Sequence, residues 1–108
     1  MTHLILTYIY SLNMNIDVEI YVSQFKTFFK DNPDEFRGLI GQGDPNDFFF
    51  EVRQAAMDNI ENGEDMELTR KQLIGVVLKI NHMSPSEEEV EKNLEPFMDH
   101  PMGKIWLN

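Results

Sequence analysis

Four helix-start signals in the middle of the chain restrict its fold more than any other feature of the sequence. In each, an Asn, Asp, Thr or Ser is followed by proline, by an acidic or amide residue three positions on, or by both. The polar side chain accepts a hydrogen bond from a free N–H of the first turn, and proline suits the first helical position. The signals are Asn32-Pro33 with Glu35, Asp44-Pro45 with Asp47, Thr69 with Gln72, and Ser84-Pro85 with Glu87. Together they predict an all-α chain.

Apolar residues between these signals recur at helical spacing and predict where the helices lie. We expect helices over residues 17–30, 33–40 and 45–62, and two more that begin near residues 69 and 84. Gly41 and Gly63 stand where the second and third helices should end, because glycine readily adopts the conformation of a C-terminal cap. Pro96 should end or bend the last helix near Leu94 or Glu95.

The predicted helices make one domain over residues 14–108, an orthogonal bundle of four or five helices. The alternative is an α+β fold in which Leu4–Leu12 and Lys104–Leu107 pair as short N- and C-terminal strands. In the all-α fold, the core should hold Phe25, Phe28, Val52, Ala56, Ile60, Leu73, Val77, Ile80, Val90 and Leu94.

Residues 1–13 form an apolar segment with two interpretations. It is an apolar leader in front of the domain, or translation begins at Met14 and the segment is an extension of the assigned reading frame. The segment is shorter than the ~20 residues of a membrane span. No Lys or Arg precedes Lys26 and no A-x-A-like cleavage site is present, unlike a secretion signal. We therefore expect a cytoplasmic protein that does not enter a membrane.

The net charge of the chain argues against two classes of partner. It carries 19 acidic and 9 basic residues, a formal net charge of −10 at pH 7. Nucleic-acid binding needs a basic surface to meet phosphate, and anionic lipids attract basic segments. We therefore expect no direct binding to nucleic acid and no docking on anionic membranes.

Signatures of catalysis are missing from the sequence. There is no cysteine, which excludes a cysteine nucleophile and thiolate zinc sites. The histidines, His3, His82 and His100, form no H-E-x-x-H pair, and there is no G-x-S-x-G or Walker motif. Gly41-Gln42-Gly43 precedes a helix, as phosphate-binding loops do, but it follows a helix rather than a strand, and Asp44 would repel an anion. We expect a protein that is not an enzyme and has no catalytic residue, cofactor or metal ion.

The segment from the third helix to the C-terminus has the spacing of two helix–loop–helix units. Leu68 and Ile105 occupy the apolar position of the two loops, and Gly103 stands at the turn of the second. In this spacing the segment resembles a pair of EF-hands. Calcium binding is not expected, because Met66 replaces the turn glycine of the first loop and Gln72 replaces its bidentate glutamate. The alternative is an ordinary pair of capped helices joined by a polar loop.

Two aromatic residues, Phe50 and Trp106, are candidates for contact with a protein partner. Phe48, Phe49 and Phe50 succeed one another ~100° apart on a helix, so the three rings cannot share one core face. Phe50 falls at the edge of the polar face, and Trp106 lies near the C-terminus. Each either packs inside the protein or anchors a partner, since aromatic residues dominate interfaces. We expect a non-enzymatic protein-interaction or regulatory module.

The acidic residues of the chain suggest an alternative function. They concentrate in Glu61–Glu67 and Glu87–Glu95, on either side of a basic helix start. An acidic surface can occupy a nucleic-acid-binding protein in place of DNA, as small viral proteins do. The alternatives to an interaction module are therefore an acidic DNA mimic that inhibits such a protein and a degenerate EF-hand-like module without calcium.

Overall fold

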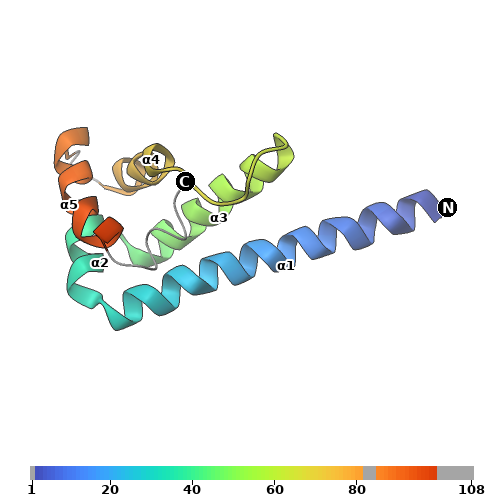
Figure 1. The fold of residues 1–108 in the computed structure, drawn as a ribbon, viewed down its shortest axis with the longest axis horizontal. Coiled ribbons are helices and arrows are strands. Elements are labelled where there is room, and N and C mark those ends of the chain that lie inside the picture. The colour runs from blue at the N-terminus through green and yellow to red at the C-terminus, as the bar shows by residue number, and fades with distance from the viewer. Residues whose placement is uncertain (1, 82–84, 100–108) are drawn as a thin grey trace.

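Five helices make up the described part of the chain (Figure 1). The computed structural model describes the backbone of residues 2–81 and 85–99 and the side chains of residues 16–81 and 85–95. No strand occurs among these residues, which confirms the predicted all-α class. The helices are α1 (Thr2–Asp31), α2 (Pro33–Ile40), α3 (Pro45–Glu61), α4 (Arg70–Ile80) and α5 (Glu87–Asp99).

The alternative of terminal strands is wrong at the N-terminal end. Leu4–Leu12 lies within α1, which continues without a break through Met14. No glycine or proline precedes Pro33, so nothing in this stretch strongly opposes a helix. The proposed partner strand, Lys104–Leu107, lies outside the described residues. Whether translation begins at Met14 stays a prediction.

α1 is the longest helix and lies along one side of the molecule, antiparallel to α3 (Figure 1). α3 packs against α1 and also against α4, and α5 packs against α2 and α4. The molecule measures 51 × 26 × 22 Å, and its long dimension follows α1 (Figure 1). The described chain is thus one compact group of helices, and its predicted orthogonal crossing stays a prediction.

Local hydrogen bonds explain three of the helix boundaries. At the start of α3, Asp44 Oδ1 accepts the N–H of Asn46 at 2.8 Å. At the start of α4, Thr69 and Gln72 form the predicted capping box, with N···O distances of 3.0 and 3.1 Å. Gly41 ends α2 with a φ of 56° and donates its N–H to a carbonyl of the last turn at 2.9 Å. Glycine adopts this conformation at little cost, and the three boundaries are confirmed.

Asn32 is the N-cap residue of α2 and Pro33 begins the helix, as predicted, but no side-chain hydrogen bond from Asn32 caps it. Its Nδ2 donates instead to the Phe28 carbonyl of α1 at 2.9 Å. One predicted cap is wrong. The last helix begins directly after Ser86 and not near Ser84. Ser86 Oγ is the group that accepts the N–H of Glu89 at 3.1 Å, so this hydroxyl defines the start.

Two helices extend further than predicted. α1 begins at Thr2 rather than at Asp17. The sequence did not predict this start, because the periodicity of a short apolar run does not distinguish a strand from a helix. α5 continues past Pro96 to Asp99 instead of ending near Leu94. A proline inside a helix removes one main-chain hydrogen bond, and α5 forms despite that loss.

Nine of the ten predicted core residues are buried, and Ile60 is partly buried. An aromatic cluster joins α1, α2 and α3; its members are Phe25, Phe29, Phe36, Phe48 and Phe49. Phe29 stacks on Phe36 with ring centres 4.2 Å apart, and Phe36 stacks on Phe49 at 5.6 Å. Phe48 meets Phe29 edge to face at 5.6 Å. These rings hold the start of α3 against α1 and α2.

Candidate interaction surface

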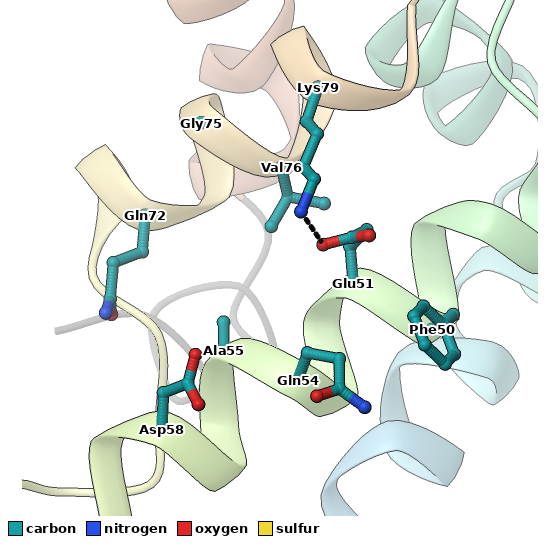
Figure 2. Close-up of a pocket in the computed structure, with 9 residues that line it drawn as sticks. All are labelled: Phe50, Glu51, Gln54, Ala55, Asp58, Gln72, Gly75, Val76 and Lys79. Carbon is teal, nitrogen blue, oxygen red and sulfur yellow. Dashed lines mark ion pairs between the residues drawn. The ribbon is translucent and has the colours of Figure 1, made fainter. Parts of the chain in front are cut away.

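A groove open to solvent lies between α3 and α4 (Figure 2). Its volume is about 530 Å³, which falls within the range of ligand and side-chain binding sites. This surface, the α3–α4 groove, is therefore large enough to receive side chains of another molecule. It is lined by Phe50, Glu51, Gln54, Ala55 and Asp58 of α3 and by Gln72, Gly75, Val76 and Lys79 of α4.

Small and apolar residues leave the middle of the groove unfilled. Ala55 stands on α3 and Gly75 on α4 (Figure 2). A Cβ atom placed on Gly75 would meet no other atom within 4 Å. Val76 supplies an apolar wall beside this space. The middle of the groove can thus accept an apolar group without displacing any side chain.

One ion pair crosses the groove. Lys79 Nζ lies 3.0 Å from Glu51 Oε2, which links α4 to α3 (Figure 2). The lysine side chain is 67% exposed, so solvent screening limits the contribution of the pair to ~0–1 kcal/mol. Asp58 adds an exposed carboxylate to the α3 wall. The groove therefore carries two acidic groups against one basic group.

A pair of amides, one buried and one partly buried, closes the end of the groove next to the α3–α4 loop. Asn59 is 3% exposed. Gln72 Nε2 donates to Asn59 Oδ1 at 2.7 Å, and Asn59 Nδ2 donates to Gln72 Oε1 at 3.2 Å. Asn59 Nδ2 also reaches the Met66 carbonyl at 3.4 Å. Each side-chain amide donates a hydrogen bond to the other and accepts one from it. The pair therefore joins the end of α3 to the start of α4, and the buried amide of Asn59 has hydrogen-bond partners.

Tyr21 of α1 holds the same loop from the other side. The N–H of Leu68 donates to Tyr21 Oη at 2.9 Å, and both residues are buried. Burial raises the pKa of Tyr21 well above its ordinary value, and the hydrogen bond from Leu68 opposes this only in part. The phenol therefore stays protonated in the folded protein and positions the loop as an uncharged group.

Phe50 lies at the rim of the groove and is 52% exposed. Its two neighbours differ, since Phe48 is fully buried and Phe49 is partly buried in the aromatic cluster. This confirms that the three rings do not share one core face. Trp106, the second predicted contact, lies outside the described residues.

Gln72, at the position where a calcium loop has its last ligand, is already held by hydrogen bonds at the start of α4. Gln72 Oε1 accepts the N–H of Thr69 at 3.0 Å and also bonds Asn59. Across residues 16–81 and 85–95, no three His, Asp or Glu side chains gather as a metal site requires. The second loop of the EF-hand resemblance, with Ile105, lies outside the described residues. That the loop does not bind calcium stays a prediction.

The two acidic groups lie apart from each other in the molecule (Figure 1). Glu61–Glu67 spans the end of α3 and the loop after it, whereas Glu87–Glu95 belongs to α5, with α4 between them. The glutamates of α5 are exposed. The described acidic residues thus belong to two separate parts of the fold, and a role as a DNA mimic stays a prediction.

Sequence reasoning did not find the α3–α4 groove. In the sequence, Glu51, Gln54 and Asp58 have the spacing of an ordinary polar helix face. The sequence did contain one sign of the groove: Gly75 interrupts an apolar run of α4, and a glycine has no side chain to fill the space beside the helix. A glycine does not reveal which helix faces it, so only the packing of α3 on α4 shows that the gap is a groove.

Comparison with known proteins provides no family for this chain. No protein-family model matches it, and neither the curated proteins nor the solved structures show a significant similarity. Of the helices within the described residues, none combines the length and apolar character needed to cross a membrane. The α3–α4 groove and Phe50 are thus the features of the described residues that bear most directly on function.

Proposed function

We propose that this chain is a non-enzymatic protein-interaction or regulatory module of the cytoplasm that binds its partner through Phe50 and the α3–α4 groove. The position of Phe50 carries the proposal: a half-exposed aromatic ring lies beside an open groove with an apolar middle. Aromatic anchors beside pockets supply much of the energy of protein interfaces. Burial of an exposed ring of this size by a partner stabilises the complex.

The chemistry of the groove defines the kind of partner segment that it fits. An apolar side chain of the partner fills the space between Ala55 and Gly75 and covers Phe50. A lysine or arginine of the partner reaches Asp58, which adds specificity more than affinity at an exposed site. A short amphipathic segment with one apolar and one basic residue meets both requirements. We propose Trp106 as a second contact, on the basis of its apolar neighbours in the sequence.

Site-specific photo-crosslinking tests this proposal. A photoreactive phenylalanine analogue at Phe50 should crosslink a specific protein from the source cell, whereas the same analogue at exposed Lys92 of α5 should not. The Phe50 crosslink should be competed by excess wild-type chain and not by Phe50→Ala. An identical set of crosslinked proteins from both positions, or equal competition by Phe50→Ala, would exclude the groove as the binding surface.

The exposed carboxylates of α5 favour one other function, that of an acidic inhibitor of a nucleic-acid-binding protein. Here the partner would be basic and its binding would weaken steeply with salt. A crosslinked partner that is lost on substitution of the α5 glutamates, and retained in Phe50→Ala, would support this function instead.

A further inference from the structure

We propose that Asn62 is a site of spontaneous covalent modification, at which its side chain reacts with the main-chain nitrogen of Gly63 and the residue becomes aspartate or isoaspartate. The reaction does not depend on binding at Phe50 and the α3–α4 groove. Asn62-Gly63 is the only Asn-Gly pair in the sequence. Both residues are exposed, and Asn62 is the C-cap residue of α3.

The reaction needs no co-reactant other than water, because asparagine is itself chemically labile. The main-chain nitrogen of Gly63 loses its proton and attacks Cγ of Asn62, and Nδ2 leaves as ammonia. The product is a cyclic imide in which the Gly63 nitrogen is bonded to both carbonyl carbons of Asn62. Water opens this ring at the side-chain carbonyl to give aspartate, or at the main-chain carbonyl to give isoaspartate. Nothing is oxidised or reduced in either step.

Gly63 makes Asn62 the most reactive asparagine among the described residues. A side chain on the following residue hinders the approach of its main-chain nitrogen, and glycine has none. Every other asparagine of the described residues is followed by a residue that has a side chain. Asn59 is the closest comparison: it precedes Ile60, is 3% exposed, and both its amide oxygen and its amide nitrogen bond Gln72. The structure therefore favours reaction at Asn62 over Asn59.

The fold restrains this reaction in two ways. The N–H of Gly63 donates to the Ile60 carbonyl at 3.0 Å, which engages the attacking nitrogen. Asn62 has a ψ of 3°, which turns its Cβ away from the Gly63 nitrogen, whereas ring closure needs both atoms on the same side of the Cα–C bond. The last turn of α3 must therefore open before the imide forms. The rate of modification follows the fraction of molecules in which this turn is open.

Either product changes the end of α3. A carboxylate near the C-terminal end of a helix is disfavoured by the helix dipole, and this one would join the exposed carboxylates of Glu61, Glu64 and Asp65. Isoaspartate also adds one carbon atom to the main chain just before Glu64, whose N–H donates to the Asn59 carbonyl at 2.8 Å. The modification should therefore loosen the start of the α3–α4 loop.

Peptide mapping of the full chain after incubation at mildly alkaline pH tests the site. Tryptic cleavage after Arg53 and Arg70 releases residues 54–70, which carry Asn62 and Asn59 in one peptide. Fragmentation by mass spectrometry should place the replacement of NH₂ by OH at Asn62 and not at Asn59. Two products of equal mass should separate by chromatography. The aspartate product should coelute with the same peptide from the variant Asn62→Asp, and the other product is the isoaspartate.

A comparison of the folded chain with the chain unfolded in urea tests the control by the fold. At the same pH and temperature, the rate at Asn62 should rise by ~10-fold or more in urea, because unfolding frees the Gly63 nitrogen and releases ψ of Asn62. Asn62→Gln is the matched control at the same exposed position. Its longer side chain would have to close a larger ring, so its amide should be retained under both conditions.

Three results would overturn the proposal. Loss of the amide at Asn59 or another asparagine before Asn62 places the modification elsewhere. Aspartate without any isoaspartate excludes the cyclic imide and indicates direct hydrolysis of the side chain. Equal rates at Asn62 in the folded and the unfolded chain exclude the last turn of α3 as the element that controls the reaction.

Discussion

The two ends of α3 are held by opposite kinds of contact. At its start, Phe48 is fully buried in the aromatic cluster. At its end, Asn59 bonds Gln72, and the loop beyond is held by the hydrogen bond between Leu68 and Tyr21. Burial of rings is nondirectional, whereas each of these hydrogen bonds needs one donor and one acceptor in a fixed geometry.

This difference determines how each end responds to change. At the aromatic end, each buried ring contributes a large free energy of stabilisation, and truncating a ring leaves a cavity that lowers the stability further. The polar end carries smaller energies per contact, and removing one partner leaves the other buried and unpaired. Because Gln72 also lines the α3–α4 groove, the polar end controls the shape of the proposed binding surface.

The largest effect should come from Phe48→Ala at the aromatic end. Loss of a fully buried ring should lower the free energy of unfolding by ~3–5 kcal/mol, measured by urea titration. Phe50→Ala is the matched control, because it removes the same ring two residues away at a 52% exposed position. Its effect should stay within ~0.5 kcal/mol. Equal losses in the two variants would contradict the assignment of the cluster.

At the polar end, Tyr21→Phe should lower the free energy of unfolding by ~1–3 kcal/mol. The ring remains, but the N–H of Leu68 loses its acceptor in a buried position. Amide hydrogen exchange of Leu68 should accelerate more than that of helical amides in α3. An unchanged exchange rate at Leu68 would show that Tyr21 does not hold the loop.

The raised pKa of Tyr21 predicts a loss of stability in alkali. The unfolded phenol titrates near pH 10, whereas the folded one titrates higher, so the unfolded state binds fewer protons above pH 10. The contribution of Tyr21 to stability is therefore complete below pH 10 and should fall by up to ~1.4 kcal/mol per pH unit above it. Tyr21→Phe lacks this contribution, and its unfolding free energy should decline less steeply. Parallel pH profiles of the two proteins would contradict the prediction.

The amide pair should show energetic coupling. In a double-mutant cycle of Asn59→Ala and Gln72→Ala, the coupling energy should be ~0.5–3 kcal/mol, because each residue satisfies the other. The cycle separates this term from the capping role of Gln72 toward Thr69, which the single variant also removes. Additive effects would mean that the pair does not close the loop.

The smallest effect should come from the ion pair between α1 and α3, outside both ends. Glu19→Gln should cost ~0.2–1 kcal/mol at low salt and less at high salt, because Glu19 and Arg53 are both accessible to solvent. Denaturation at two salt concentrations measures the difference. A larger loss that does not depend on salt would show that the pair is shielded from solvent.

Sequence reasoning recovered the helical class because its signals are local. The capping box of Thr69 and Gln72 joins residues three apart, and Gly41 bonds back into the turn before it. Such contacts form wherever the helix forms, so the chain itself specifies them. Apolar spacing likewise identified most of the core, since apolar residues at helical spacing gather on the part of each helix that is buried.

The errors occurred where two local interpretations were both possible. Asn32 is the N-cap residue of α2, but its side chain bonds back to the Phe28 carbonyl, one turn away in α1, and not to the first turn of α2. Ser84 and Ser86 are both capable caps, and Ser86 is the one that accepts an amide hydrogen. Leu4–Leu12 suited a strand or a helix, and α1 includes it.

Capped helices with an apolar face follow from the sequence alone, because hydrogen bonds and side-chain spacing within a turn need no distant partner. The candidate site, in contrast, depends on how the helices pack. Asn59 bonds a residue 13 positions away and Leu68 one 47 positions away. The groove beside Phe50 exists because α3 and α4 pack side by side, with exposed Gly75 on the groove wall. The spacing within a helix states which side chains share a face. It does not state which helix meets that face, because several packings bury the same apolar area.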